Sequence, residues 1–413
     1  MRSPTEIRSH SAGPMRILQP VSVPVALVVA WAVLAAISAV LLLCATVTLV
    51  RRCPQLCGLR PPEPSKWPAL SVVVPACNEA TRIEAALASL LAQDYPDLEI
   101  VVVDDRSTDG TRAIVERLAQ SDPRISAVRV SELPGGWLGK VHALQRGFER
   151  VRGDFILFTD ADTHFAPGVL RRAVAWVEAQ QLDHLAVLAE VRYPSFAVAV
   201  CAHSALRGVL ALARPWEAMN PRSAKAIGTG AFNLVRRAAF ERTPGFEWLR
   251  LEVADDIGLG LMMKRWGGRP GLVLGRGQVR LHSYLTFSEA ARGLEKNCFA
   301  QGARFSPWRG LAMVILGAIG AFGPFAAFLP VGVPWLWAVG ASGLLAVGAG
   351  SIVVAQAFRT PIAYVLLSLP VGDLLMTYVI ARATVLGVWR GGLVWRGTTY
   401  PTELLRGGRR VDM

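Results

Sequence analysis

Charged residues are missing from two long stretches of the chain, Ile17–Val50 and Leu311–Phe358. The Val25–Leu43 part of the first stretch is long enough to cross a bilayer, which takes about 20 apolar residues. It is too long for the core of a signal peptide, and no small-residue cleavage site follows it. We therefore expect an uncleaved transmembrane anchor there. The second stretch predicts two spans, separated by a short loop that contains Pro330 and Pro334.

Cysteine is too sparse to build a covalent framework, and acidic residues are in deficit. The six Cys residues have no regular spacing, so no disulfide framework or zinc site is recognisable. The 44 Lys and Arg residues exceed the 31 Asp and Glu residues, which gives a net charge of +13. The arginines are concentrated beside hydrophobic segments, as at Arg51 and Arg52, a pattern that favours anionic lipid head groups at a cytoplasmic face. We expect a membrane partner and no nucleic-acid partner.

Between the hydrophobic stretches, short apolar strands such as Leu70–Val74 and Glu99–Val103 alternate with helices. This alternation predicts a parallel α/β sheet, which binds ligands at the carboxyl ends of its strands. A later strand is expected at Lys225–Val235, where Gly228 and Gly230 indicate close approach of a ligand to the backbone. The predicted parts of the chain are an N-terminal tail (1–20), a transmembrane anchor (21–50), a stiff proline-rich linker (51–68), an α/β domain (69–308), membrane segments (309–389) and a basic tail (390–413).

The apolar strand Phe155–Phe158 is followed by two aspartates, Asp160 and Asp162. Because they are separated by one residue, an extended strand end would direct both carboxylates the same way. That arrangement suits a hard divalent cation that bridges protein oxygens to a diphosphate. Aspartate also caps the turn that follows a strand, and this alternative stays open for the tripeptide on its own.

Polar residues follow other predicted strands as well. Asp104 and Asp105 end one strand, and two adjacent carboxylates at a buried strand end repel each other, which favours contact with a ligand. A glycine-rich loop leads into a helix with Lys140 in its first turn, where the helix dipole and the lysine both attract phosphate. Asp255 and Asp256 begin another helix; one can cap it, which leaves the other available as a general base.

Three segments near the hydrophobic stretches are open to two interpretations. Arg304 can belong to a site, but taken alone it fits an amphipathic lead-in that reaches lipid phosphates. The helix expected at Phe196–Ala213 lies either at the membrane surface or buried in the α/β domain. The hydrophobic segment Pro361–Ala381 carries Asp373 and is interrupted by Pro370. We expect it to form a re-entrant or interfacial hairpin that leaves the basic tail beside the site, with a full crossing as the alternative.

Taken together, these motifs are similar to those of the family-2 glycosyltransferases, inverting enzymes of the GT-A fold. The resemblance covers about Ala69 to Pro307 and rests on five motifs in the family's order. It implies a Rossmann-like α/β domain of the GT-A type with one N-terminal transmembrane helix and C-terminal transmembrane or interfacial helices. Carried onto this sequence, it implies donor contacts from Pro75, Asn78, Glu79, Asp104, Asp105, Lys140 and Asp160, a metal at Asp160 and Asp162, catalysis by Asp255 and Asp256, and acceptor or diphosphate contacts from Gln301, Arg304 and Phe305.

The sequence departs from the family pattern at two positions. The family usually has Glu-Asp where this chain has Asp255-Asp256, so Asp256 is the candidate base. The segment Gln301-x-x-Arg304-Phe305 is similar to the Q-x-x-R-W motif of lipid-linked and processive members, with Phe in place of Trp. The order of the hydrophobic segments resembles that of ceramide glucosyltransferases and hopanoid-associated glycosyltransferases.

The resemblance implies an integral-membrane enzyme that moves a sugar from a nucleotide-diphospho-sugar, with a UDP-sugar as the expected donor, to a lipid hydroxyl. Mg²⁺ or Mn²⁺ is the implied cofactor. The implied location is a bacterial inner membrane, with the catalytic domain in the cytoplasm. Two other functions stay open, a processive polysaccharide synthase and a non-catalytic membrane protein that binds a nucleotide sugar.

Overall fold

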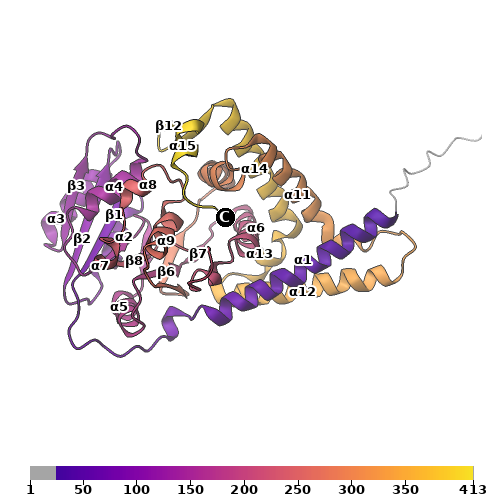
Figure 1. Cartoon of the computed structure of the whole chain (residues 1–413), viewed down its shortest axis with the longest axis horizontal. Coiled ribbons are helices and arrows are strands. Elements are labelled where there is room, and N and C mark those ends of the chain that lie inside the picture. The colour runs from indigo at the N-terminus through magenta and orange to yellow at the C-terminus, as the bar shows by residue number, and fades with distance from the viewer. Residues whose placement is uncertain (1–24, 413) are drawn as a thin grey trace, which may run out of the picture.

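The computed structural model describes residues 25–412. The predicted N-terminal tail (1–20) and the first residues of the predicted anchor lie outside this range. Figure 1 shows an α/β part on one side and long helices on the other, with the C-terminal segment between them. The first helix, α1 (Val25–Arg52), belongs to the helical part although it precedes the α/β part in sequence.

A seven-stranded sheet forms the centre of the α/β part. Strand β1 pairs in parallel with β2 and β4, and β8 is antiparallel to both of its neighbours. The carboxyl ends of β1, β2 and β4 therefore meet at one edge, as the sequence predicts. In spatial order the strands are β3 (Ile125–Val130), β2 (Leu98–Asp105), β1 (Leu70–Ala76), β4 (Phe155–Phe158), β8 (Asn233–Arg236), β6 (His184–Leu188) and β9 (Pro270–Leu274).

Alternate residues of the central strands enter two hydrophobic cores, one on each face of the sheet. In β1, Val73 belongs to one core, while Val72 and Val74 belong to the other. A strand that is buried on both faces has no polar face, so it appears in the sequence as a continuous apolar run. The helices of this part are α2 (Ile83–Leu91), α3 (Thr111–Ser121), α4 (Gly139–Phe148), α5 (Val169–Ala179), α7 (Arg237–Phe240), α8 (Phe246–Leu249), α9 (Asp255–Arg265) and α10 (Phe287–Gly293).

Two predictions about this part need correction. The strand expected at Lys225–Val235 is limited to β8, because the residues before Asn233 form a loop that packs against the start of α9. The proline-rich linker is attached to the domain instead of spacing it from the membrane. The backbone N–H of Leu274 donates to the carbonyl of Pro54 at 2.9 Å, and Leu56 in η1 (Leu56–Gly58) is fully buried.

A small three-stranded sheet lies beside the main one and carries the residues that follow the predicted metal site. It consists of β5 (Thr163–Phe165), β10 (Val279–His282) and β7 (Glu190–Arg192), with β10 in the middle. Strand β5 begins directly after Asp162. The small sheet therefore connects Asp160 and Asp162 to strands that lie near the helical part.

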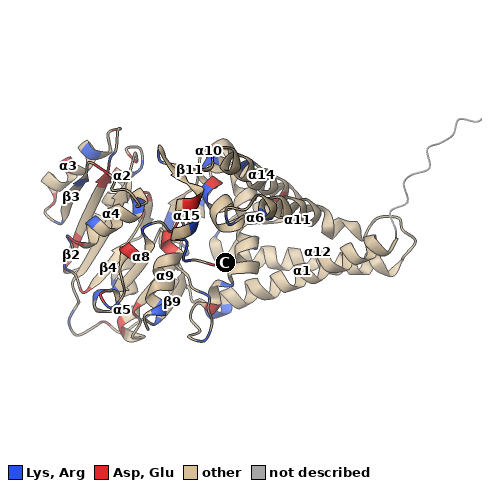
Figure 2. Ribbon diagram, turned by 45° about the horizontal axis from the view of Figure 1, so that its top comes forward, with Lys and Arg blue, Asp and Glu red and all other residues tan. Residues whose placement is uncertain are grey.

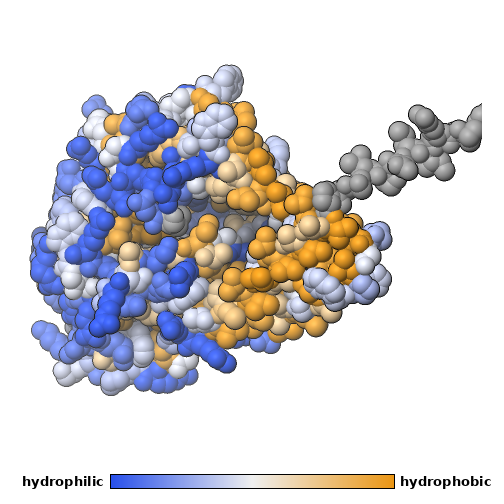
Figure 3. Space-filling view, turned by 45° about the vertical axis from the view of Figure 1, so that its right-hand side comes forward, coloured by the Kyte–Doolittle hydropathy of each residue, from blue (hydrophilic) through white to orange (hydrophobic). Residues whose placement is uncertain are grey.

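Within residues 25–412, five helices are long and apolar enough to cross a membrane by length and composition. Figure 2 shows few charged residues along the ribbons of α1 and α12, and Figure 3 shows apolar residues over the visible face of the helical part. Four of the five correspond to predicted hydrophobic stretches, and the fifth contains α6. The helices of this part are α1, α6 (Phe196–Ala213, followed by η2, Pro215–Glu217), α11 (Pro307–Ala326), α12 (Trp335–Phe358), α13 (Ile362–Leu366) and α14 (Asp373–Trp389), with η4 (Ser368–Gly372) before α14.

The directions of these helices follow from close contacts at glycine. Gly343 lies against Ala36 and Gly350 against Leu43, so α1 and α12 run parallel and both end at the α/β part. Thr384 lies against Gly310, near the beginning of α11. Helix α11 begins at the α/β part and runs away from it. Because α14 is antiparallel to α11, α14 runs toward the α/β part and ends there.

The stretch of chain from the end of α12 to the end of α14 therefore begins and ends on the side of the α/β part, as expected of a hairpin. It is broken at Leu369, whose φ of −115° and ψ of 123° are not helical, directly before Pro370. Asp373 is ion-paired with Arg207 and accepts a hydrogen bond from Ser204, both on α6. This pairing supplies the counter-charge that a carboxylate among apolar helices requires.

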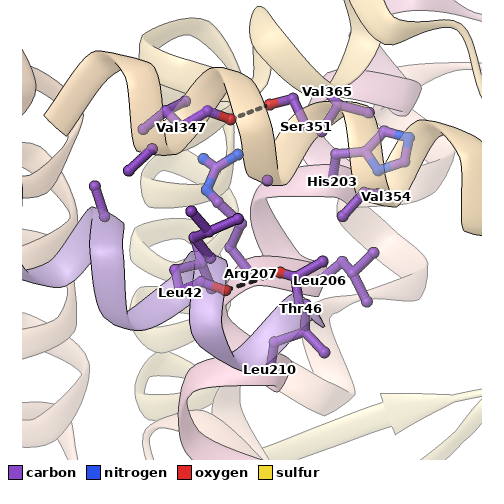
Figure 4. A pocket seen from close by; sticks show the side chains of 14 residues that line it. Leu42, Thr46, His203, Leu206, Arg207, Leu210, Val347, Ser351, Val354 and Val365 are labelled. Atoms are coloured by element: carbon purple, nitrogen blue, oxygen red, sulfur yellow. Dashed lines mark hydrogen bonds between the residues drawn. The ribbon is translucent and has the colours of Figure 1, made fainter. Parts of the chain in front are cut away.

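A cavity among these helices is too small to hold a lipid chain. Figure 4 shows a cavity between α1, α6 and α12, lined mainly by apolar side chains such as Leu42 and Leu210. Its volume is about 30 Å³, which is room for a water molecule or two. The hydroxyls of Thr46 and Ser351 donate to carbonyls of their own helices, so they are not directed at a ligand.

We expect the two ends of the helices to lie on opposite sides of a membrane, with the α/β part in the cytoplasm. Arg52, Arg309 and Arg359 all lie at the end beside the α/β part, in agreement with the positive-inside rule. In a variant that lacks the exposed Cys44, Thr399→Cys should resist a membrane-impermeant thiol reagent in intact spheroplasts. Pro330→Cys, in the loop between α11 and α12, should react. Labelling of Thr399→Cys before lysis would contradict this topology.

Candidate active site at the carboxyl edge of the sheet

The loop after β1 is held to the loop after β2 by hydrogen bonds. Thr108 N donates to Asn78 Oδ1 at 2.8 Å, and Asn78 N donates to Ser107 Oγ at 3.0 Å. Asn78 has a left-handed backbone with φ of 56°, which asparagine tolerates better than most residues. The predicted donor contact by Asn78 is therefore indirect in this structure, because its amide oxygen joins the two loops that line the cleft.

Asp104 and Asp105 are both buried at the end of β2, but their surroundings differ. Asp105 is held in a two-pronged ion pair by its neighbour Arg106, with distances of 2.7 Å and 3.0 Å. Asp104 Oδ1 is buried and has no hydrogen-bond partner within residues 25–412. A buried acceptor without a partner is costly, so Asp104 is the better candidate for contact with a base or ribose.

Lys140, in the first turn of α4, lies among carboxylates from two other elements. Its Nζ atom is 2.7 Å from Asp160 Oδ1 and 3.3 Å from Asp255 Oδ2. Burial alone would lower the pKa of Lys140, but the carboxylates, Asp160 foremost, raise it. Burial likewise would raise the pKa of Asp160, and Lys140 outweighs this and lowers it. Lysine and aspartate are therefore both charged in the site.

Asp162 lies in a less balanced environment. Burial and the nearby carboxylates of Asp160 and Glu79 raise the pKa of Asp162 to about 6, although Arg82 opposes the shift. Arg82 Nη1 lies 3.3 Å from Asp162 Oδ2. The two aspartates of the predicted metal site thus repel each other across a single turn.

These residues fit a divalent cation that is partly held by the substrate. Within the described residues no group of three or more His, Cys, Asp and Glu side chains is placed to hold a metal by itself. Mg²⁺ is commonly bound through one or two carboxylates together with substrate phosphates and water. Asp160 and Asp162 provide two such carboxylates, and a cation would relieve the repulsion that raises the pKa of Asp162.

Asp256 is fixed at the start of α9 by backbone groups. Gly230 N donates to Asp256 Oδ2 at 3.0 Å, and Ile257 N donates to Oδ1 at 2.8 Å. Burial, followed by the adjacent charge of Asp255, raises the pKa of Asp256 to about 6. A carboxyl group with this pKa is deprotonated near neutral pH yet is more basic than an ordinary aspartate, which suits a general base.

The glycines of the loop before β8 approach protein atoms instead of a ligand, which corrects the sequence interpretation. A methyl group at Gly228 would lie 1.7 Å from the carbonyl oxygen of Asp256. A methyl group at Gly230 would lie 2.2 Å from Asp160 Oδ2. The two glycines therefore allow the start of α9 and Asp160 to come together in one site.

The segment Gln301–Phe305 begins within the π-helical turn η3 (Asn297–Gly302) and extends past its end, and its residues do not share one role. Phe305 is 2% exposed and packs edge-on against Phe299, so the prediction that it contacts the acceptor is wrong for this structure. Gln301 Nε2 donates to the buried Glu252 at 3.0 Å. Arg304 lies 3.6 Å from Asp412 of the C-terminal tail.

The C-terminal tail adds site residues that motif spacing did not identify. It forms the hairpin β11 (Gly392–Trp395) and β12 (Thr398–Pro401), followed by α15 (Thr402–Gly408). Arg396 pairs with Glu79, and the Tyr400 hydroxyl accepts a hydrogen bond from Gly139 N at 3.3 Å. The hairpin thus covers the start of α4, where phosphate was expected, and the tail lies beside the site as predicted.

Lys296 is a second half-buried lysine near the carboxylates. Burial lowers the pKa of Lys296, and the neighbouring Lys140 adds to this effect, while Asp255 opposes it. Its Nζ atom lies 3.8 Å from the centre of the Trp395 ring in the hairpin. No sequence motif marks Lys296; it precedes Gln301 by less than two helical turns, and only the fold brings it to Asp255.

In the present conformation the side chains fill the space between them. The remaining cavity between Lys140, Asp160 and Asp256 measures about 10 Å³, less than a ligand requires. What the arrangement offers chemically is a half-buried lysine at a helix start, a carboxylate that is basic enough for a general base, and two carboxylates that suit a cation.

Comparison with known proteins connects this geometry to a family. Residues 71–243 match the model of glycosyl transferase family 2. A β-1,3-glucosyltransferase of Campylobacter jejuni that acts on GalNAc(5)-diNAcBac-PP-undecaprenol is 36% identical over 103 residues, 25% of this chain and 32% of that protein. A poly(ribitol-phosphate) β-N-acetylglucosaminyltransferase of Staphylococcus aureus is 34% identical over 119 residues, 28% of this chain and 20% of that protein. The chain thus spans less than half the length of these curated relatives.

A solved structure resembles nearly the whole chain. The mannosyltransferase of Pyrobaculum calidifontis, in complex with GDP-Man and Mn²⁺, superimposes with a TM-score of 0.52. The alignment covers 88% of this chain and 99% of that one, at 23% sequence identity. This likeness shows a shared GT-A fold. The nearer resemblance to ceramide glucosyltransferases stays a prediction.

Substitutions at Phe305 and Arg304 should separate a core role from a site role. Phe305→Ala should lower the free energy of unfolding by about 3–5 kcal/mol because it empties a filled core position, and Phe305→Leu should retain most of the stability. Arg304→Ala should weaken activity more than Phe305→Leu does, because the arginine can offer a forked pair of hydrogen bonds to a diphosphate. Thermal unfolding in detergent measures the first effect, and an activity assay measures the second. A stable Phe305→Ala protein with weakened acceptor binding would restore the stacking interpretation.

Proposed function

We propose, for a chain in which residues 71–243 form a glycosyl transferase family 2 domain of the GT-A fold, an inverting glycosyl transfer from a nucleotide-diphospho-sugar to a lipid hydroxyl. The observation that carries the proposal is the convergence of Lys140, Asp160 and Asp256 at one edge of the sheet. A lysine at a helix start suits an anionic donor, and a basic carboxylate suits the hydroxyl of an acceptor.

The donor would lie along the carboxyl ends of β1, β2 and β4. The unpartnered Oδ1 atom of Asp104 offers an acceptor to the base or ribose. The start of α4 offers backbone N–H groups and the Lys140 ammonium to the diphosphate. A UDP-sugar is the donor we expect, and the GDP-Man of the Pyrobaculum protein shows that the fold accommodates a nucleotide-diphospho-sugar.

In the proposed reaction Asp256 takes the proton of the acceptor hydroxyl as that oxygen bonds to the anomeric carbon. The bond between this carbon and the diphosphate oxygen breaks at the opposite face, so the configuration inverts and the nucleoside diphosphate leaves. Lys140 stabilises the charge that develops on the leaving diphosphate. A divalent cation held by Asp160 and Asp162 supplies Lewis-acid stabilisation of the same oxygens when it is bound.

A lipid acceptor is supported by the position of the site beside the apolar helices. Phe299 of η3 packs on Gly387 near the end of α14, so the segment that leads to Gln301 is in contact with a candidate membrane helix. The Campylobacter relative acts on an undecaprenol-linked acceptor. We propose that the reaction takes place at the cytoplasmic face, where nucleotide sugars are available.

Purified protein in lipid nanodiscs tests the function directly. Incubation with a panel of labelled nucleotide sugars, followed by mass spectrometry of the lipid extract, should yield a lipid that carries one added sugar. A ladder of longer products would favour a polysaccharide synthase. Absence of both transfer and donor hydrolysis across the panel would overturn the proposal in favour of a binding protein.

Asp256→Asn should lower turnover by about 10²-fold or more with donor binding nearly intact, as expected for loss of a general base. Asp255→Asn should cost less, because Asp255 is paired with Lys140. Since the pKa of Asp256 is raised to about 6 and only the deprotonated form accepts a proton, wild-type kcat/KM should fall as pH decreases through about 6. A pH–rate profile that stays flat down to pH 5 would contradict this assignment, as would an Asp255→Asn variant that is the less active of the two.

Asp160→Asn and Asp162→Asn should abolish transfer, and a chelator should do the same to the wild type. Either substitution removes a charge from the proposed cation site while it keeps the side-chain volume. Equilibrium dialysis with Mn²⁺ and donor measures metal binding by each variant. Arg82→Gln, a change at a neighbouring residue, is the control that separates loss of metal binding from general damage to the protein. Full activity of both aspartate variants in the presence of chelator would show that these residues only shape the turn.

A further inference from the structure

A second polar cavity lies on the far side of the small sheet from Asp162. It has a volume of about 510 Å³, far larger than the space left between the catalytic carboxylates. Strands β7 and β10 form one wall, and the turn between α12 and α13 forms the other. Unlike the cavity of Figure 4, it contains the side chains of three arginines, Arg192, Arg280 and Arg359.

These guanidinium groups face only one carboxylate in the cavity lining, that of Glu190. Glu190 is 6% exposed, and its Oε2 atom accepts a hydrogen bond from Gly277 N at 2.9 Å. Arg192 lies 3.7 Å from its other oxygen, Oε1. Within residues 25–412, neither Arg280 nor Arg359 has an ion-pair partner. The cavity lining therefore carries an excess of positive charge that the protein leaves unbalanced.

The backbone between the arginines holds them close together. Arg280 donates to the carbonyl of Gly277 at 3.5 Å. A methyl group at the same glycine would lie 3.0 Å from Arg359 Nη1. Two guanidinium groups from different parts of the chain thus lie beside one turn, where an anion can accept hydrogen bonds from both. Guanidinium groups bind phosphate oxygens in this forked manner.

The cavity lies at the level where a membrane surface is expected. Because α1 and α12 run parallel with Gly350 against Leu43, Arg359 at the end of α12 is level with Arg51 and Arg52 at the end of α1. Arginines at the cytoplasmic ends of spanning helices occupy the head-group layer.

Apolar side chains continue from the cavity toward the helices. Tyr364 lines the cavity and packs edge-on against Phe196, with ring centroids 5.9 Å apart. Phe196 is 46% exposed, and the neighbouring Ile362 and Leu366 are 43% and 39% exposed. A molecule with an anionic head and apolar tails therefore finds a charged cavity and an apolar surface next to each other.

We propose that this cavity binds the phosphate group of an anionic membrane lipid, with the head group among Arg192, Arg280 and Arg359 and the acyl chains against α13 and Phe196. Basic pockets between membrane helices on the cytoplasmic side bind lipid head groups in this way. The site is separate from the donor cleft, and the proposal does not depend on sugar transfer. A soluble phosphate compound shares the chemistry of the head group but makes no use of the apolar surface.

The test uses the full-length protein in detergent, titrated with short-chain phosphatidylglycerol, while the shift of the thermal unfolding midpoint is recorded. Phosphatidylcholine of the same chain length and inorganic phosphate are the comparison ligands. The wild type should bind phosphatidylglycerol at least tenfold more tightly than either. The double variant Arg280→Gln/Arg359→Gln should lose at least tenfold in affinity, because both unpaired cations are removed.

Arg51→Gln is the matched control, since it removes one exposed charge at the same level outside the cavity. It should bind phosphatidylglycerol within about twofold of the wild type. Without lipid, all variants should unfold near the wild-type midpoint. If Arg51→Gln loses as much affinity for phosphatidylglycerol as the double variant, the binding depends on general surface charge, and the proposal is overturned. Equal affinity for inorganic phosphate would identify a soluble anion as the ligand and would also overturn it.

Discussion

The structure of the site depends on one charge arrangement, in which the half-buried Lys140 lies among three aspartates. Removal of one partner would leave a partly desolvated charge without compensation. The elements that carry these residues must therefore pack closely. Gly228 and Gly230 make this possible, since any side chain there would collide with Asp256 or Asp160.

The same arrangement distinguishes the two members of each aspartate pair. Lys140 forms ion pairs with Asp160 and with Asp255. Asp162 and Asp256, the second members of the pairs, have less positive charge nearby to compensate their own. Burial raises the pKa of each to about 6. A single lysine thus divides four carboxylates into two that are fixed by charge and two that are ready to accept a cation or a proton.

Much of the fold and part of the site could be predicted from the sequence, and the limits have physical causes. The strand ends and Lys140 were identifiable because a parallel sheet places consecutive motifs at one edge. Phe305 was misassigned because a motif gives residue types and not burial. Lys296 and Arg396 were missed because neither belongs to a local pattern, and only tertiary packing brings them to the site. The environment of α6 stayed undecided because an apolar helix of its length suits both a domain core and a membrane.

The C-terminal segment joins the candidate membrane helices to the proposed donor site, so the two parts are connected by more than the chain. At the end of α14, Arg390 pairs with the buried Glu295, whose neighbour Lys296 lies against the ring of Trp395 in β11. The hairpin then carries Arg396 to Glu79 in the loop after β1. Ion pairs and a ring contact therefore link the end of α14 to the loop after β1. An α/β domain cut before α11 would lack this cover, and the start of α4 would be open to water.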